Sequence, residues 1–107
     1  MEENFLVVSS DSISNVEIKE YIGIVQGSTV RGRNIGADFL ARLKNIVGGE
    51  LVGCTSLLSK TREQALMRMI EDAKSKGGNA VVAFRYQTST ITDGASEILA
   101  FGTAVKI

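Results

Sequence analysis

The chain has 107 residues, and its 12 Lys and Arg side chains balance 12 Asp and Glu side chains, so the formal net charge is zero. A chain of this length holds one modest core, and we expect residues 1–107 to form a single domain. Zero net charge creates no strong field to attract nucleic acid or an anionic membrane surface, so we expect neither as a partner.

The sequence contains no histidine and one cysteine, Cys54. Ser-His-Asp and Cys-His catalytic systems are therefore excluded. A zinc site built from the Cys and His residues of one chain is excluded as well, because it needs three or four such ligands. A lone cysteine cannot form an intrachain disulfide, and the start of the chain is acidic where a signal peptide would be basic. We expect a cytoplasmic protein.

The N-terminal part of the chain predicts a loop followed by a long strand. A short apolar segment, residues 5–8, precedes a polar stretch over residues 9–15 that is typical of a loop. Residues 16–31 are rich in Ile, Val and Thr and predict a strand. Gly23 and Gly27 lie inside it, which indicates a bulge or the close approach of another backbone.

Two helices are expected next. Asn34 is a suitable N-cap for a helix over residues 35–47, which Gly48-Gly49 would end. A second helix is predicted over residues 58–76, with its start open as far back as Glu50. Its apolar residues recur at helical spacing and form one stripe, consisting of Ala65, Leu66, Met69, Ile70 and Ala73. Gly77-Gly78 would end it.

Residues 79–91 and 95–107 predict two strands joined through Thr92-Asp93-Gly94, a strong hairpin signal. Ala100, Gly102 and Ala104 give the last strand one face of small residues, against which another element can pack closely. Strands at both ends with helices between them indicate an α+β fold, with an antiparallel sheet and helices on one face.

Cys54 is a candidate metal ligand only through symmetry. A subunit with one thiol builds a multi-thiolate site by oligomerising, and copies of Cys54 near an axis could hold a soft ion such as Cu(I) or Zn(II). The alternative is a structural cysteine, since a free cysteine is commonly a small buried hydrophobe.

A second candidate site lies at the predicted start of the first helix. Arg31, Arg33 and Asn34 would place two guanidinium groups beside backbone N–H groups, which together could receive a phosphate or carboxylate. The alternative is an ordinary strand-to-helix connection, and the spacing matches neither the P-loop nor the dinucleotide fingerprint.

Several short motifs, in order along the chain, resemble those of the YbjQ-like family, which is also labelled a heavy-metal-binding domain. They are Glu20-Tyr21 with Gly23, Val25 and Gly27; Gly32 and Asn34 with Asp38; Ile46-Val47-Gly48-Gly49; Arg62-Glu63 with Ala65; Gly77 with Asn79-Ala80-Val81-Val82; and Gly102-Thr103-Ala104-Val105. The resemblance implies a subunit similar to those of the dodecin fold, assembled as a homopentameric ring.

The sequence departs from the family pattern at two places. After Gly48-Gly49 the chain continues as Glu50-Leu51-Val52-Gly53-Cys54-Thr55, so the arginine, tyrosine and glutamate that members tend to carry there are replaced. Arg85 and Gln87 to Ser89 stand where members favour an acidic strand. These changes remove oxygen ligands that a divalent cation would use.

We therefore expect a non-catalytic, oligomeric binding or structural protein whose partner is a copy of itself. Two alternatives stay open. One is soft-metal or redox binding through a ring of Cys54. The other is an enzyme with an intersubunit site, which would need a perturbed lysine or carboxylate in place of histidine.

Overall fold

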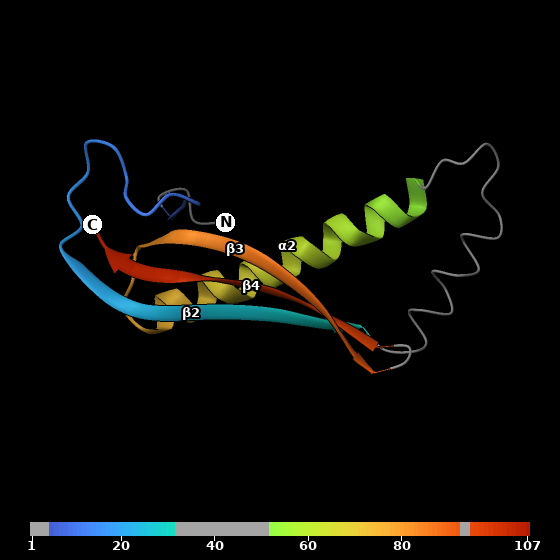
Figure 1. Ribbon diagram of the computed structural model, residues 1–107. Coiled ribbons are helices and arrows are strands. Elements are labelled where there is room, and N and C mark those ends of the chain that lie inside the picture. The colour runs from blue at the N-terminus through green and yellow to red at the C-terminus, as the bar shows by residue number, and fades with distance from the viewer. Residues whose placement is uncertain (1–4, 32–51, 93–94) are drawn as a thin grey trace.

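The computed structural model describes residues 5–31, 52–92 and 95–107, without the side chains of residues 31, 52–58, 91, 92 and 95. Four strands form one sheet and a long helix crosses one of its faces (Figure 1). The elements are β1 (Leu6–Val7), β2 (Glu20–Arg31), α2 (Val52–Ser75), β3 (Ala80–Thr92) and β4 (Ala95–Lys106). The expected α+β class is confirmed for this part of the chain.

The sheet has the strand order β1-β3-β4-β2 and is mixed, so the fully antiparallel sheet that we expected is wrong. The three long strands pair antiparallel, but β1 pairs parallel with β3 through Leu6 and Val7. The sequence pattern did not reveal β1 because two residues are too short to show an alternation. The strand expected from residue 16 begins at Glu20, because residues 9–19 cross the sheet as a loop.

Helix α2 begins at Val52, which settles the open start of the second predicted helix and places Gly53 inside it. The first predicted helix, residues 35–47, lies outside the described residues. Gly77 and Gly78 end α2 as expected. The Gly78 N–H donates to Ala73 O at 2.9 Å and the Gly77 N–H donates to Lys74 O at 3.0 Å, with Gly77 at φ 92°. This pair of bonds is a Schellman motif, which requires the left-handed backbone that glycine adopts readily.

The main core lies between α2 and the sheet. A narrow stripe of α2, formed by Ala65, Met69 and Ala73, packs on Val25 of β2 and on the small side chains of β4. Ala100 and Ala104 belong to that small-residue face, so the expectation that something packs closely against it is confirmed. The alanines leave room for the helix backbone to approach the strands.

A smaller core lies on the other side of the sheet, near the chain ends. There Ala80, Val82 and Val105 are buried under partly buried apolar side chains of the N-terminal loop, Val8, Ile13 and Ile18. The loop is held by backbone bonds from the N–H groups of Ala83 and Phe84 to Ser10 O and Val8 O. It therefore covers one half of this face and leaves the other half open.

Candidate functional site

The open half of the sheet, on the side away from α2, is the most distinctive surface of the described residues. We call it the outer face. It consists of Ile24, Gln26, Ser28 and Val30 of β2, Glu97, Leu99, Phe101 and Thr103 of β4, and Arg85, Gln87 and Ser89 of β3. The alternation of β2 places these residues opposite to Val25, Gly27 and Thr29, which are buried toward α2.

Apolar side chains on this side of the sheet are unusually exposed. Ile24 is 75% exposed and Val30 is 54% exposed. Tyr21, which pairs with Val105 at the end of β2, is 63% exposed. Single exposed apolar residues are ordinary, but a group of them on one face of a sheet is typical of an interaction surface.

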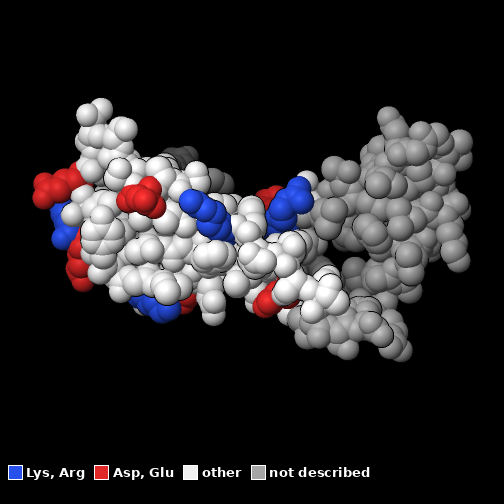
Figure 2. All heavy atoms as spheres, viewed as in Figure 1, with Lys and Arg blue, Asp and Glu red and all other residues white. Residues whose placement is uncertain are grey.

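The strand register makes these residues neighbours. Ile24 lies opposite Thr103 and Gln26 lies opposite Phe101, so Ile24 and Phe101 are diagonal neighbours across the strand pair. Figure 2 shows a broad uncharged area between separate charged groups on the side of the molecule that it displays. The outer face is thus mainly apolar and uncharged polar, with two charged residues, Arg85 and Glu97.

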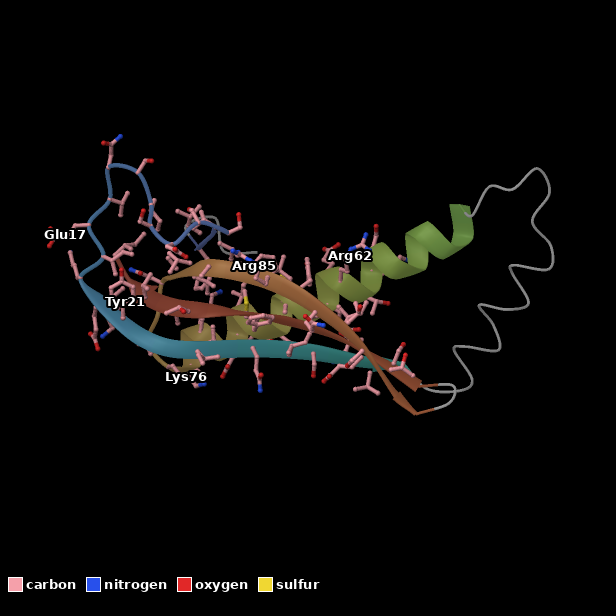
Figure 3. The ribbon with its side chains drawn as sticks, in the orientation of Figure 1. Glu17, Tyr21, Arg62, Lys76 and Arg85 are labelled. Atoms are coloured by element: carbon pink, nitrogen blue, oxygen red, sulfur yellow. The ribbon has the colours of Figure 1, made fainter. Side chains whose placement is uncertain are left out.

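The described charged groups do not gather into a site. Arg85 Nη1 donates to Ser9 O at 2.8 Å and to Phe84 O at 2.7 Å, so this side chain holds the N-terminal loop on β3. Lys106 pairs with Glu20 at 3.5 Å, and Lys76 pairs with Asp72 at 3.3 Å as their spacing in the sequence predicts. In Figure 3 Glu17, Arg62, Lys76 and Arg85 lie on different parts of the molecule and do not point toward one another.

Tyr86 forms a polar contact between β3 and α2. Its hydroxyl donates to Arg62 O at 3.2 Å, and its ring meets Phe84 edge-to-face with the centroids 4.8 Å apart. Burial raises the pKa of Tyr86 above its ordinary value of 10.0, with a smaller lowering by Arg62 and a smaller raising by Glu63. The hydroxyl therefore stays neutral at physiological pH and acts as a structural donor.

The residues that the sequence suggested as sites lie mostly outside the described part. The backbone of Cys54 belongs to the first turn of α2, and Arg31 is the last residue of β2, but neither side chain is described. Arg33 and Asn34 fall between residues 31 and 52, outside the described residues. Neither the thiolate ring nor the anion site is tested by the structure, and both stay predictions.

Comparison with known proteins identifies the family. A family model described as "Putative heavy-metal-binding" matches residues 5–107. The UPF0145 protein of Vibrio parahaemolyticus is 48% identical over 102 residues, which cover 95% of this chain and 97% of that protein. The chain belongs to the YbjQ family. The UPF0145 protein of Archaeoglobus fulgidus is also similar to this YbjQ-family chain, with 45% identity over 107 residues, 100% of the chain and 99% of that protein.

The fold is shared with a protein of known structure. A crystal structure of a protein of unknown function from Pediococcus pentosaceus, assigned to the DUF74 family, superposes with a TM-score of 0.61. The alignment covers 96% of the YbjQ-family chain and 97% of the other chain at 11% sequence identity. At that identity the likeness shows the fold alone.

The family description raises the question of a metal, and the described residues do not fit one. Among the described side chains, no three of the His, Cys, Asp or Glu type lie together. Soft ions prefer thiolate and imidazole ligands, whereas the whole sequence offers one cysteine and no histidine. Asp72 and Glu20 already pair with lysines. The described side chains of one chain therefore provide no set of ligands for a metal ion.

One feature of the described surface, the exposure of Ile24, could not be predicted from the sequence. The exposure of Ile24 has a weak signal, because Ile24 and Val25 are consecutive in a strand and must point to opposite faces. The pattern alone does not say which face is covered.

Within the residues that the structure describes, no helix is long and apolar enough to cross a membrane.

Proposed function

We propose that this YbjQ-family chain is one subunit of a closed homo-oligomer that binds a ligand rather than catalysing a reaction, and that the outer face of each copy is covered by a different surface of the next copy. The observation that carries the proposal is the exposure of Ile24 and Val30 beside Leu99 and Phe101 on the outer face. Burying such side chains provides the main favourable free energy of association, about 25 cal/mol per Å² of apolar surface.

A second copy is the occupant that the properties of the chain favour. Its formal net charge is zero, so copies do not repel one another at long range, and no field selects a partner of opposite charge. The Cα radius of gyration is 16.6 Å, with extents of 51 × 28 × 22 Å. A compact domain of about 100 residues has a radius of gyration near 13 Å, so the described part of the chain is more elongated than a compact domain.

We propose five copies, because the resemblance to the YbjQ-like family implies a pentameric ring. A binding role is supported by the chemistry of the described part. Histidine is absent from the sequence. Arg85 joins β3 to the N-terminal loop, and Lys106 pairs with Glu20 between two strands, so these groups make structural contacts. A ligand site would then be shared between subunits, where residues of two copies come together.

The outer-face contact is tested by placing a charge on it. Ile24→Glu places a carboxylate in the proposed contact, where it would have to lose its water. Ile24 is exposed in the single chain, so the variant chain should still fold. We expect sedimentation velocity to show dissociation of the oligomer to monomers. The matched control is Met67→Glu, an exposed apolar residue of α2, which should leave the oligomer intact. Dissociation by the control alone would place the contact on α2 and contradict the outer-face assignment.

Soft-metal binding at a ring of Cys54 is a second candidate function. The family description and the position of Cys54 in the first turn of α2 favour it, because the positive end of a helix dipole stabilises a thiolate. Purification under reducing conditions should then yield an oligomer containing copper or zinc at less than one ion per chain. Mass spectrometry should find that metal lost in Cys54→Ser. Equal metal content in the two proteins would remove Cys54 as a ligand.

A further inference from the structure

Strand β2 lies at the edge of the sheet, and its 12 residues make it a long edge. An edge strand presents backbone N–H and C=O groups that can pair with a strand of another chain. Pairing of that kind repeats from copy to copy and can give open-ended assemblies instead of a closed ring. A long edge therefore needs some protection.

Two side chains of α2 reach the edge of β2. The Gln26 N–H donates to Asp72 Oδ2 at 3.0 Å, and Arg68 Nη1 donates to Ser28 O at 2.6 Å. Arg68 and Asp72 are one helical turn apart, and Gln26 and Ser28 are two residues apart along the strand. In an antiparallel strand, residues two apart direct their backbone polar groups to the same side, so both bonds lie on the side away from β4.

Gly27, between the two bonded residues, explains how the helix comes so close. A Cβ atom built on Gly27 would meet Met69 N, and would lie 2.5 Å from Ala65 O and 2.6 Å from the carbonyl carbon of Arg68. The helix backbone thus rests on the strand backbone at this point. Arg68 and Asp72, on the turns around Met69, are thereby placed beside the strand edge.

We propose that Arg68 and Asp72 form a blocking pair that closes the β2 edge against strand pairing with another chain. An incoming strand would have to replace two charge-assisted hydrogen bonds and would separate the guanidinium and the carboxylate from the backbone groups that they bind. Asp72 Oδ2 also accepts from Lys76 Nζ at 3.3 Å, which holds the carboxylate in position. The inference does not depend on the proposed oligomer, because a monomer needs a closed edge as well.

The first test compares wild type with the double variant Arg68→Met and Asp72→Ala, which keeps apolar bulk at residue 68 and removes both bonds. We expect sedimentation velocity and infrared spectroscopy to show larger, concentration-dependent species with intermolecular β-structure. The control is Glu71→Ala, which removes an exposed carboxylate next to Asp72 and should leave the size distribution unchanged. A folded double variant with the wild-type size distribution would overturn the blocking role.

The second test needs no folded double variant. Amide hydrogen exchange in wild type should show the Gln26 N–H protected although it faces outward from an edge strand. Its exchange in Asp72→Ala should be at least about tenfold faster, since one hydrogen bond to a carboxylate is lost. Exchange of the wild-type Gln26 amide as fast as that of exposed loop amides would contradict the inference. A monomeric wild type would instead remove the proposed oligomer and leave this result unaffected.

Discussion

Gly23 and Gly27 show how much local structure can be predicted from the type of a single residue. Glycines inside a strand indicate a bulge or the close approach of another backbone. Gly23 lies at a bulge, and Gly27 lies at a close approach. The register of β2 against β4 shifts between Tyr21 and Gly23, where Gly23 takes a φ of 140°. Gly27 lies in regular strand but against the backbone of α2. The residue type predicts that something special occurs, while the partner that approaches is set by tertiary packing.

Gly27→Ala should destabilise the fold strongly. The added methyl group meets backbone atoms of α2, which cannot rotate away as a flexible side chain would. We expect a loss of at least about 2 kcal/mol in the free energy of unfolding, as for overpacked cores. Chemical denaturation of the variant measures it. Gln26→Ala is the control, because that side chain is exposed, and it should change stability by less than about 0.5 kcal/mol. Equal stability of the two variants would contradict the close contact.

Tyr86 gives a pH-dependent prediction. Burial raises its pKa in the folded chain above 10.0, so the folded state favours the neutral phenol. The stabilisation is complete below the unfolded pKa and is lost as pH rises through the folded pKa. In the Tyr21→Phe variant, which isolates Tyr86, the ultraviolet absorbance of the phenolate should therefore titrate with a midpoint above 10.0. A midpoint at or below this value would show that the hydroxyl is not held as described.

Prediction of whole elements succeeds where a pattern is long and fails where it is short. The apolar stripe of α2 and the hairpin signal between β3 and β4 correspond to observed elements. Pairing of β1 with β3 rests on two residues, and a bulge in β3 places Ala83 at φ 55°, a backbone conformation rare for alanine. Ala83 carries no local signal for this conformation. It follows from the hydrogen bonds that the N-terminal loop makes to the bulge.

The Asn79 side chain joins the start of β3 to the end of β4 through two hydrogen bonds to Ile107. Its Nδ2 donates to Ile107 O at 3.0 Å, and its Oδ1 accepts from the Ile107 N–H at 2.8 Å, so it joins the start of β3 to the end of the chain. Asn79→Ala should lower the free energy of unfolding by about 1 kcal/mol, since both bonds are lost at an exposed position. In Asn79→Asp an unprotonated carboxylate oxygen would face Ile107 O, so this variant should be no more stable than Asn79→Ala in thermal unfolding. An aspartate variant as stable as wild type would show that the Nδ2 bond to Ile107 O does not stabilise the fold.

For the whole molecule, the composition and pattern of the sequence predict the α+β class but do not predict the outer face. Ile24 and Val30 are apolar and point away from α2, and the sequence pattern of β2 does not tell which of its two faces is covered. A single chain gives no reason for that arrangement, whereas a second copy over the outer face does. Sequence reasoning evaluates one chain at a time, so a surface completed by a neighbour is visible only after the fold is known.

The central claim is that copies of this chain cover one another's outer faces. Native mass spectrometry of wild type at micromolar concentration tests it most directly, with Ile24→Glu measured beside it. We predict a wild-type mass of about five times 11.5 kDa and a variant mass of one chain. A stably folded wild-type protein with the mass of one chain would contradict the claim.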